Sequence, residues 1–212
     1  MNKCKTLNSC GVLFVIAAPS GTGKTSLVRA LSAAVDKLEI SISYTTRPPR
    51  LGETHGSDYF FIDKKEYEEL LRADQFLEHA NIYGYDYATS RKWVRQKLDE
   101  GLDVILEIDW QGAAQIKQKM SDAVFIFILP PSLSALNERL LQRNQDSDHI
   151  IKKRMAAAQE EISHFKEFNY IIVNEDFSHA LTELKYIIFA HRLSLSRQEI
   201  QLADLLEQLL KK

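Results

Sequence analysis

The chain has 212 residues, 45% of them hydrophobic, so it can bury a sizeable core as one domain or as one domain that carries insertions. Its 27 basic and 29 acidic residues give a formal net charge of −2, which argues against nucleic acid or an anionic membrane as a partner. No apolar run approaches the roughly 18 residues that a membrane-spanning helix needs. A disulfide between Cys4 and Cys10 would close only a tiny loop, so we expect reduced thiols and a cytoplasmic location.

Five apolar runs along the chain have the pattern of strands that are buried on both faces. They cover residues 12–17, 39–43, 103–108, 123–129 and 169–173. Helical patterns lie between these runs, and this alternation is typical of an α/β fold with a parallel sheet covered by helices on both faces. In such folds ligands bind at the C-terminal ends of the strands.

The sequence "APSGTGKT" at residues 18–25 follows the first predicted strand and leads into the helical pattern "KTSLVRAL". It approaches the phosphate-loop pattern G-x-x-x-x-G-K-[ST], with Ala18 in place of the first glycine. Gly21 and Gly23 allow the tight turn that aims backbone N–H groups at phosphate oxygens. Lys24 adds a positive charge, and the Thr25 hydroxyl can bind Mg²⁺. A glycine-rich turn that only connects strand and helix is the alternative, but the strand–loop–helix context favours a nucleoside triphosphate site.

Two further helices have recognisable ends. Ser90 is a candidate N-cap for a helix over residues 91–100, and Gly101 suits the position that follows a helix. Ser132 comes directly after two prolines and precedes leucines at helical spacing. These leucines are Leu133, Leu136 and Leu140.

Two segments break the alternation of strands and helices. Residues 44–90 contain short aromatic, extended stretches around one helical pattern, "KKEYEELLRA", and are predicted to form an inserted, strand-rich subdomain. Residues 139–154 hold basic side chains around the polar stretch "NQDSD" and are predicted to form a mobile, charged flap. Its basic residues are Arg139, Arg143, Lys152, Lys153 and Arg154.

Six motifs in a fixed order give the chain a resemblance to the guanylate kinase family. They are "APSGTGKT", "TTRPPRLGETHGSDYFF", "FLEHANIYGYDYATS", "LEIDWQGA", "FILPPS" and "IVNEDF", and the resemblance extends from about Gly11 to about Arg192. It implies a P-loop NTPase-type parallel sheet with helices on both faces, an inserted GMP-binding subdomain and a mobile lid. It also implies an enzyme that uses Mg²⁺ and transfers a phosphoryl group from ATP to GMP, and to dGMP, giving ADP and GDP for the supply of GTP.

The resemblance also implies a division of the chain. We expect an N-terminal tail at residues 1–10, a guanylate kinase-like domain at 11–192 and a C-terminal helical extension at 193–212. Within the domain we expect a core of residues 11–43, 91–138 and 155–192, a GMP-binding insert of residues 44–90 and a lid of residues 139–154. Leucines at helical spacing mark the extension, and we expect them to pack on the same molecule rather than on a second subunit, with the oligomeric state left open. They are Leu202, Leu205, Leu206, Leu209 and Leu210.

By resemblance, the whole phosphate loop binds ATP, and a second group of residues binds the phosphate of GMP. The loop residues are Ala18, Pro19, Ser20, Gly21, Thr22, Gly23, Lys24 and Thr25. The GMP phosphate would be held by Ser43, Arg47, Arg50, Tyr59 and Tyr87. Guanidinium groups bind phosphate oxygens through paired, charge-assisted hydrogen bonds, and hydroxyl groups fill the remaining acceptors. Two ordinary basic residues in a solvated loop are the alternative for "TRPPR".

The resemblance assigns the guanine base to Glu78 and Thr89, with Asp109 assisting. One carboxylate can accept both N1–H and the N2 amino group of guanine, and a threonine hydroxyl can donate to O6. Adenine lacks this pair of donors, so it would leave a buried carboxylate unsatisfied and be rejected. A surface carboxylate on an edge strand is the alternative for Glu78.

The stretch "VILEIDWQGA" resembles a Walker B region, with Glu107 where relatives often have aspartate. Thr25 is the expected Mg²⁺ ligand, and the longer side chain of Glu107 leaves open whether it reaches the metal through water. The residues expected to act in the transfer are Lys24, Arg47, Arg139, Arg143 and Arg154. They would align the substrates and neutralise charge, because phosphoryl transfer needs little covalent chemistry from the protein. Ion pairs on a helix surface are the alternative for the last three arginines.

Besides Ala18 and Glu107, four positions depart from the family pattern. Gln142 and Asn144 stand where relatives often have glycine, next to the middle arginine of the lid. Ala88 replaces a glycine, and Thr89 replaces a serine. These departures concern the geometry of the lid and of the site, and they do not change the class of reaction.

Two other functions are compatible with the fold. A catalytically silent binding module is one, and the intact "GTGKT" with both sets of arginines argues against it. A kinase for another acceptor, such as a pyrimidine monophosphate, is the second, and the guanine-reading pair Glu78 and Thr89 argues against that.

Overall fold

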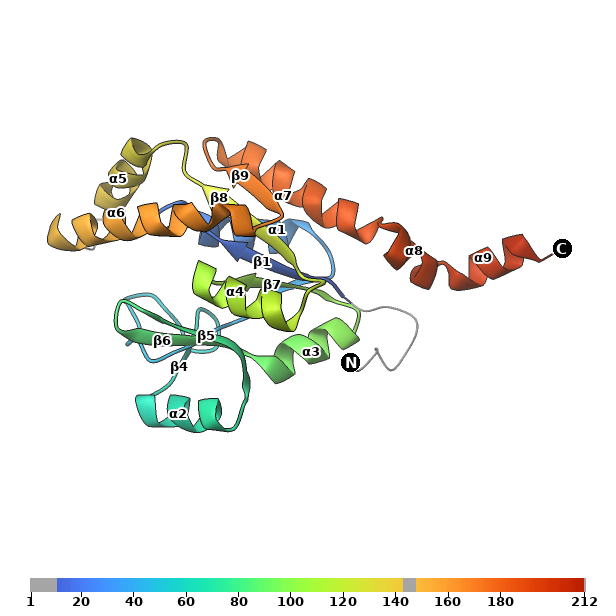
Figure 1. The fold of residues 1–212 in the computed structure, drawn as a ribbon, viewed down its shortest axis with the longest axis horizontal. Helices are drawn as coiled ribbons and strands as arrows, with labels where there is room; N and C mark the ends of the chain where they lie inside the picture. Colours follow the sequence, from blue (N-terminus) through green and yellow to red (C-terminus); the bar gives the residue numbers. More distant parts are fainter. Residues whose placement is uncertain (1–10, 143–147, 212) are drawn as a thin grey trace.

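The structure of the chain is a computed structural model that describes residues 11–142 and 148–211, without the side chains of residues 148–152. The central sheet has five strands, all parallel, in the order β2-β7-β1-β8-β9 (Figure 1). The strands are β1 (Leu13–Ala17), β2 (Leu38–Ile40), β7 (Asp103–Glu107), β8 (Val124–Leu129) and β9 (Tyr170–Val173). The predicted α/β fold with a parallel sheet is therefore confirmed. The N-terminal tail with Cys4 and Cys10 lies outside the described residues.

The strand predicted at residues 39–43 is wrong in its second half. The structure ends β2 at Ile40, although the backbone N–H of Ser41 still donates to Ile105 O at 2.9 Å. The chain then leaves the central sheet, and Tyr44 begins a strand of a second sheet. An extended apolar pattern within one window cannot show that its residues are divided between two sheets.

The central strand β1 supplies the core on both faces of the sheet. All five of its residues are buried, and successive side chains of a strand point to opposite faces. Phe14 and Ile16 pack with α1 and α7, whereas Leu13 and Val15 pack with α3 and α4. The helices are α1 (Lys24–Ala34), α3 (Arg91–Asp99), α4 (Trp110–Lys119) and α7 (Phe177–Arg192). Helices therefore cover both faces, as expected for a buried parallel sheet.

Two helix ends follow the local signals of the sequence. The Ser90 side chain accepts a hydrogen bond from Trp93 N at the start of α3, and the left-handed Gly101 follows the end of that helix. The Ser132 side chain accepts from Ala135 N at 3.0 Å where α5 (Leu133–Gln142) begins. The N-cap predicted at Ser90 is confirmed, and Ser132 caps the helix that the leucine spacing predicted.

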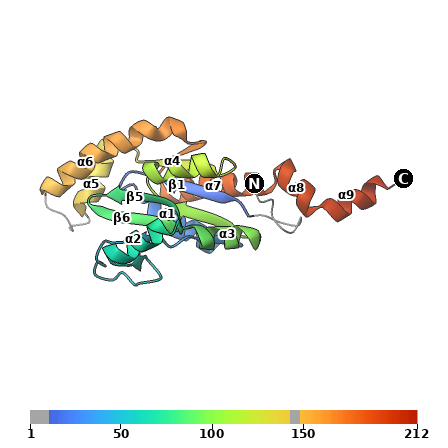
Figure 2. The ribbon, with the colours of Figure 1, turned by 60° about the horizontal axis from the view of Figure 1, so that its bottom comes forward.

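A second, four-stranded sheet has the order β4-β3-β6-β5 and lies beside the central sheet (Figures 1 and 2). Its elements are β3 (Tyr44–Thr45), β4 (Phe60–Phe61), α2 (Lys64–Arg72), β5 (Phe76–Ile82) and β6 (Tyr85–Ser90). It has a small core of its own around Tyr67, Phe76 and Ala88. The residues expected to form an inserted, strand-rich unit around one helix do fold into a separate sheet.

Two helices, α5 and α6 (Asp148–Ser163), and the short 3₁₀ helix η1 (His164–Glu167) follow β8. Leu136 and Leu140 of α5 pack against Met155 and Ala158 of α6 in a separate apolar cluster. The described part of the segment expected to be a flap is therefore helical, and α6 continues beyond residue 154 without a break. Arg143 and Asn144 lie outside the described residues.

The C-terminal extension consists of two helices, α8 (Leu195–Gln201) and α9 (Ala203–Leu210), which extend away from the body in Figure 1. Leu205, Leu209 and Leu210 are 48%, 70% and 78% exposed, so the expectation that this stripe packs on the same molecule is wrong. Helical spacing indicates an amphipathic helix but does not show which surface lies within its reach. Within the described ranges no helix combines the length and apolar character that crossing a membrane requires.

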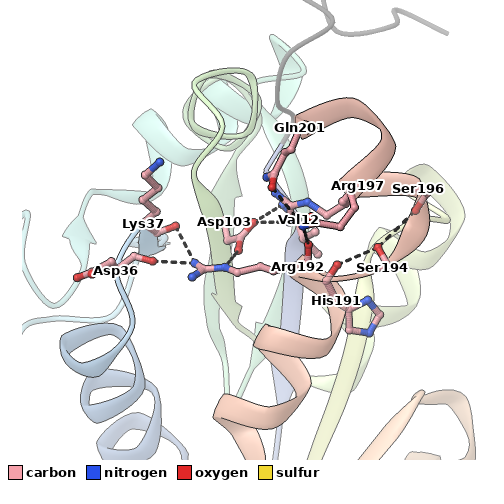
Figure 3. Close-up of polar contacts among 11 residues, drawn as sticks. Val12, Asp36, Lys37, Asp103, His191, Arg192, Ser194, Ser196, Arg197 and Gln201 are labelled. Carbon is pink, nitrogen blue, oxygen red and sulfur yellow. Dashed lines mark hydrogen bonds and ion pairs between the residues drawn. The ribbon is translucent and has the colours of Figure 1, made fainter. Parts of the chain in front are cut away.

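A buried aspartate connects this extension to the central sheet (Figure 3). Asp103, at the start of β7, accepts hydrogen bonds from Arg192 Nε at 2.8 Å and from Arg197 Nη1 at 2.9 Å. It also accepts from the backbone N–H of Val12 at 2.7 Å. One carboxylate therefore joins β1, β7, the end of α7 and the start of α8, at the edge of the sheet opposite to the strand ends that hold the candidate site.

Candidate functional site

The phosphate loop lies between the end of β1 and the start of α1. Gly21 and Gly23 have φ angles of 95° and 93°, which L-residues rarely adopt, and α1 begins at Lys24. Thr22 is fully buried, and its hydroxyl donates to Pro19 O at 2.7 Å, which fixes the turn. Because Gly23 has no side chain to cap α1, the first N–H groups of this helix are oriented to receive an anion.

Both glycines are also required by close packing. A Cβ atom on Gly21 would lie 2.9 Å from Leu140 of α5, and one on Gly23 would lie 2.7 Å from Asn174 Nδ2. The departure at Ala18 is different. The described residues with positive φ do not include Ala18, so a side chain at this buried position costs no backbone strain.

Lys24 and Thr25 both reach the end of β7, the strand next to β1. Lys24 Nζ donates to Ile108 O at 2.8 Å, and the Thr25 hydroxyl donates to Glu107 Oε1. The sheet register brings this about, since Ile16 of β1 lies opposite Glu107 of β7. The structure thus brings together the two side chains that the sequence associated with Mg²⁺.

Arg47 is 8% exposed and lies among tyrosines and one carboxylate. Its Nε donates to Tyr87 OH at 3.2 Å, and its Nη2 donates to both carboxylate oxygens of Glu53, at 2.8 and 2.9 Å. Its guanidinium carbon lies 5.4 Å from the centre of the Tyr59 ring. Burial disfavours the charge of Arg47, but the hydrogen bonds with Glu53 and Tyr87 outweigh burial and raise its pKa. Three of the predicted phosphate-binding residues are thus neighbours.

Tyr59 belongs to the same cluster, because its ring lies edge-on to the Tyr87 ring with ring centres 5.9 Å apart. Burial raises the pKa of Tyr59 to about 12, and the negative charge of Glu107 adds to the effect. Tyr59 therefore keeps its proton and can donate a hydrogen bond at neutral pH.

The other two residues predicted for the GMP phosphate lie at the edge of this cluster. Ser43 is half-buried just before β3, and its carbonyl accepts from Phe60 N at 2.9 Å. The Arg50 side chain is exposed, and the Arg50 backbone N–H donates to Glu53 Oε2 at 2.7 Å. Glu53 thus holds both arginines of "TRPPR", although the sequence analysis gave it no role.

Glu78 and Thr89 face each other on paired positions of β5 and β6. They are 3% and 0% exposed, and the Thr89 hydroxyl donates to Glu78 Oε1 at 2.6 Å. Burial raises the pKa of Glu78 to about 7, against the hydrogen bond from Thr89, and the charge of Asp109 raises it further. The alternative of a surface carboxylate is therefore wrong for Glu78.

The start of α4 lies against this carboxylate. Asp109 is the N-cap of α4, and its side chain accepts from Gly112 N at 2.9 Å. A Cβ atom on Gly112 would lie only 2.5 Å from Glu78 Oε2. The side chain of any other residue at position 112 would therefore collide with this carboxylate. Asp109 therefore shapes the helix start, and Gly112 permits the close approach of Glu78.

Two of the three lid arginines can be placed. Arg139 of α5 donates to Thr22 O at 3.3 Å and to Asn174 O at 2.9 Å, so it contacts the phosphate loop itself. Asn174 is 5% exposed and donates to Thr22 O at 2.7 Å, a role that the quoted motif "IVNEDF" did not reveal. Arg154 is half-buried on α6. Burial raises the pKa of Tyr83, and the charge of Arg154 only partly opposes this effect.

Comparison with known proteins gives one consistent answer. Residues 11–191 match the family model described as guanylate kinase. The guanylate kinase of Coxiella burnetii (strain RSA 493 / Nine Mile phase I) is 52% identical over 200 residues, which cover 94% of this chain and 97% of that protein. The guanylate kinase of Escherichia coli (strain K12) is 51% identical over 202 residues, covering 94% and 98%.

A solved structure agrees with the sequence relatives. The crystal structure of guanylate kinase from Anaplasma phagocytophilum superposes with a TM-score of 0.75 at 34% identity, and the match covers 90% of each chain. The family model, two curated relatives and this structure all carry the same name, and each match covers most of the chain. The chain therefore belongs to the guanylate kinase family.

Proposed function

We propose that the chain transfers the terminal phosphoryl group of ATP to GMP and so forms ADP and GDP. The observation that supports this proposal most directly is the buried Glu78–Thr89 pair, whose carboxylate lies against Gly112 at the start of α4. Membership of the guanylate kinase family supports the same reaction. We propose dGMP as a second acceptor, because the assigned contacts are made to the base and the phosphate.

The guanine base would be read by the carboxylate of Glu78 and the hydroxyl of Thr89. Glu78 offers two acceptor oxygens to the N1–H and N2 amino groups, and Thr89 turns its hydroxyl from Glu78 to the guanine O6. Adenine would face the buried carboxylate without these donors, which is the kind of mismatch that gives strong rejection. Asp109 assists from the N-terminus of α4.

The phosphate of GMP would be bound by the arginine and tyrosine cluster. Glu53 holds the Arg47 guanidinium and keeps a buried positive charge paired. A phosphate can replace this partner with paired, charge-assisted hydrogen bonds, while Tyr59 and Tyr87 donate through their hydroxyls. Arg50 and Ser43 would complete the set from the exposed edge of the cluster.

The ATP phosphates would be bound by residues 18–25, with Lys24 as the mobile charge. Thr25 and Glu107 present oxygen atoms, which suit Mg²⁺, a cation that keeps several waters and bridges substrate phosphates. When bound, Mg²⁺ would neutralise charge on the phosphates. Arg139, Arg143 and Arg154 would add positive charge around the transferred group, and closing the lid over it would exclude water.

We further propose the division of the chain given above, with residues 44–90 as the GMP-binding unit and residues 139–154 as the lid. The separate cores of the second sheet and of the α5–α6 pair support two units that can move against the central sheet. A cytoplasmic location also remains a prediction.

A coupled assay with ATP and four acceptors tests the proposed function. We expect turnover with GMP and dGMP, and at least about 10³-fold lower kcat/KM with AMP and UMP, because only guanine pairs with Glu78 and Thr89. The Glu78→Gln variant should lose most of its kcat/KM for GMP while its KM for ATP stays near that of the parent.

The exposed Glu68→Gln serves as the matched control, because it removes one carboxylate from the same subdomain outside the site. No turnover with any acceptor would support the silent binding module instead. Better turnover with UMP than with GMP would support a kinase for a pyrimidine acceptor. Equal loss of GMP and ATP affinity in Glu78→Gln would contradict the assignment of the base site.

A further inference from the structure

The strand that carries Glu78 is held along its outer edge by side chains of α4. Among the described residues β5 is the last strand of the second sheet, so the backbone groups on its outer side face no further strand. The Gln115 side chain pairs with His79 at this edge. Its Oε1 accepts from His79 N at 3.2 Å, and its Nε2 donates to His79 O at 2.5 Å. One amide side chain therefore makes the two hydrogen bonds that a neighbouring strand would make.

Lys119 bonds to the same edge of β5 one turn further along α4. Its Nζ donates to Leu77 O at 2.6 Å. Leu77 and His79 are two residues apart, so their backbone groups point to the same edge of the strand. Gln115 and Lys119 are four residues apart, so their side chains lie on the same face of the helix. The two spacings match, because two strand residues span about 6.6 Å and four helical residues rise about 6 Å.

Glu78 lies in the chain between the two residues whose backbone groups are held in this way. Its carboxylate lies against Gly112 of the same helix, so Gly112, Gln115 and Lys119 present one face of α4 to β5. The helix itself is fixed to the central sheet, because Ile116 is fully buried in the core that includes β1. Figure 1 shows α4 between the two sheets. The position of Glu78 is therefore referred to the central sheet through α4.

We propose that Gln115 and Lys119 are positioning residues, which hold the backbone on either side of Glu78 and so set where its carboxylate meets the guanine base. They act through Glu78 rather than on the nucleotide. The inference rests on the proposed function, because it takes Glu78 as the residue that reads guanine. A carboxylate that accepts from N1–H and from the N2 amino group together must lie in one place, and small displacements of such groups are costly.

Lys119 also favours the ionised form of Glu78, which the recognition of guanine requires. Burial raises the pKa of Glu78 to about 7, and the positive charge of Lys119 opposes this rise. The hydrogen bond to Leu77 O holds this charge at the residue next to Glu78. Lys119 thus supports both the position and the charge of the carboxylate, whereas the neutral Gln115 supports only its position.

The test compares two acceptors, GMP and inosine monophosphate, whose base lacks the 2-amino group of guanine. Steady-state kinetics with Mg²⁺ and ATP give kcat/KM for each acceptor, and the parent should prefer GMP. We expect Lys119→Met and Gln115→Met, which keep the length of the side chain, to reduce this preference about tenfold. That factor corresponds to one hydrogen bond to a charged group at the low end of its range. The KM for ATP should stay near that of the parent.

Lys117→Met is the matched control on the same helix. Lys117 Nζ also donates to a backbone carbonyl at 2.6 Å, but this carbonyl belongs to Glu167 of η1 rather than to β5. Its removal should cost a similar amount of stability in thermal unfolding and leave the preference for GMP unchanged. The exposed Gln118→Met serves in the same way for Gln115. Lys119→Arg, which keeps the charge and the donor, should retain most of the preference of the parent.

A purely structural role for the two side chains gives a different result. Loss of folded protein lowers kcat/KM for both acceptors by the same factor, so their ratio stays at the value of the parent. An unchanged ratio in Lys119→Met or in Gln115→Met would overturn the inference, and so would an equal change in Lys117→Met. Failure of the proposed function is seen earlier, because the parent itself would then not phosphorylate GMP or would not prefer it to inosine monophosphate.

Discussion

Glu78 is a buried carboxylate whose protonation affects the stability of the fold. Burial raises its pKa from an ordinary 4.5 to about 7, so the folded chain holds a proton that the unfolded chain loses between these values. The free energy of unfolding contributed by this residue therefore falls as pH rises through that interval. We expect Glu78→Gln, which cannot ionise, to be more stable than the parent by up to about 3 kcal/mol at pH 8, with no gain at pH 4.

Urea unfolding of both proteins at the two pH values measures this difference. The exposed Glu68→Gln should show no comparable gain at either pH. A Glu78→Gln variant that is less stable than the parent at pH 8 would mean that the carboxylate is stabilised by contacts rather than strained by burial. The expected gain implies that the chain gives up stability at neutral pH by keeping the carboxylate of Glu78 buried.

Residue types predicted which side chains belong to the candidate site, but they did not predict which residues those side chains would contact. Arg47, Tyr59 and Tyr87 were expected to share one phosphate, and they are neighbours in the fold. The pairing of Arg47 with Glu53 was not predicted, because a carboxylate in a polar loop carries no sign of the charge that it will meet. Gly112 was quoted within a motif, but only the fold shows that Glu78 occupies the space of its missing side chain.

At the scale of elements, one buried carboxylate holds four of them together. Asp103 is 2% exposed and pairs with Arg192 and Arg197, so its removal leaves two guanidinium groups without their acceptor. We expect Asp103→Ala to lower the free energy of unfolding by about 3 kcal/mol, the low end for a broken buried pair, since both arginines keep some exposure to water.

Denaturant unfolding of Asp103→Ala checks this value, and Asp122→Asn, on an exposed turn, is the control. A loss below about 0.5 kcal/mol would show that solvent screens the pair and that α8 is held by other contacts. Activity should change less than stability, because Asp103 lies at the opposite end of β7 from Glu107.

Helix caps could be predicted from the sequence, but long-range packing could not. Ser90 and Ser132 cap the helices that follow them because the signal lies within four residues of the helix start. The end of β2 was misjudged because the next residues belong to a second sheet. Local preferences therefore located most elements, and tertiary context decided where one sheet gives way to another.

For the whole molecule, the exposed leucines of α9 predict that the last helix contributes little to the fold. Removal of residues 203–212 should change the free energy of unfolding by less than about 0.5 kcal/mol and leave GMP phosphorylation intact. Removal of residues 193–212 also takes away Arg197 and should destabilise the chain clearly. Thermal unfolding and activity of the two truncated proteins check both statements. A large loss from the shorter deletion would mean that α9 packs against the body or a second subunit.

The sequence by itself determined the phosphate loop, the alternation of buried strands and helices, and the family to which the chain belongs. These properties depend on residue type and on spacing within short windows, where backbone sterics and side-chain chemistry act directly. Only the tertiary structure decided that Glu53 neutralises Arg47 and that Asp103 anchors the C-terminal helices. Arg47, Arg192 and Arg197 are positively charged in any conformation, but which carboxylate reaches each of them depends on strand order and helix placement, which short windows do not encode.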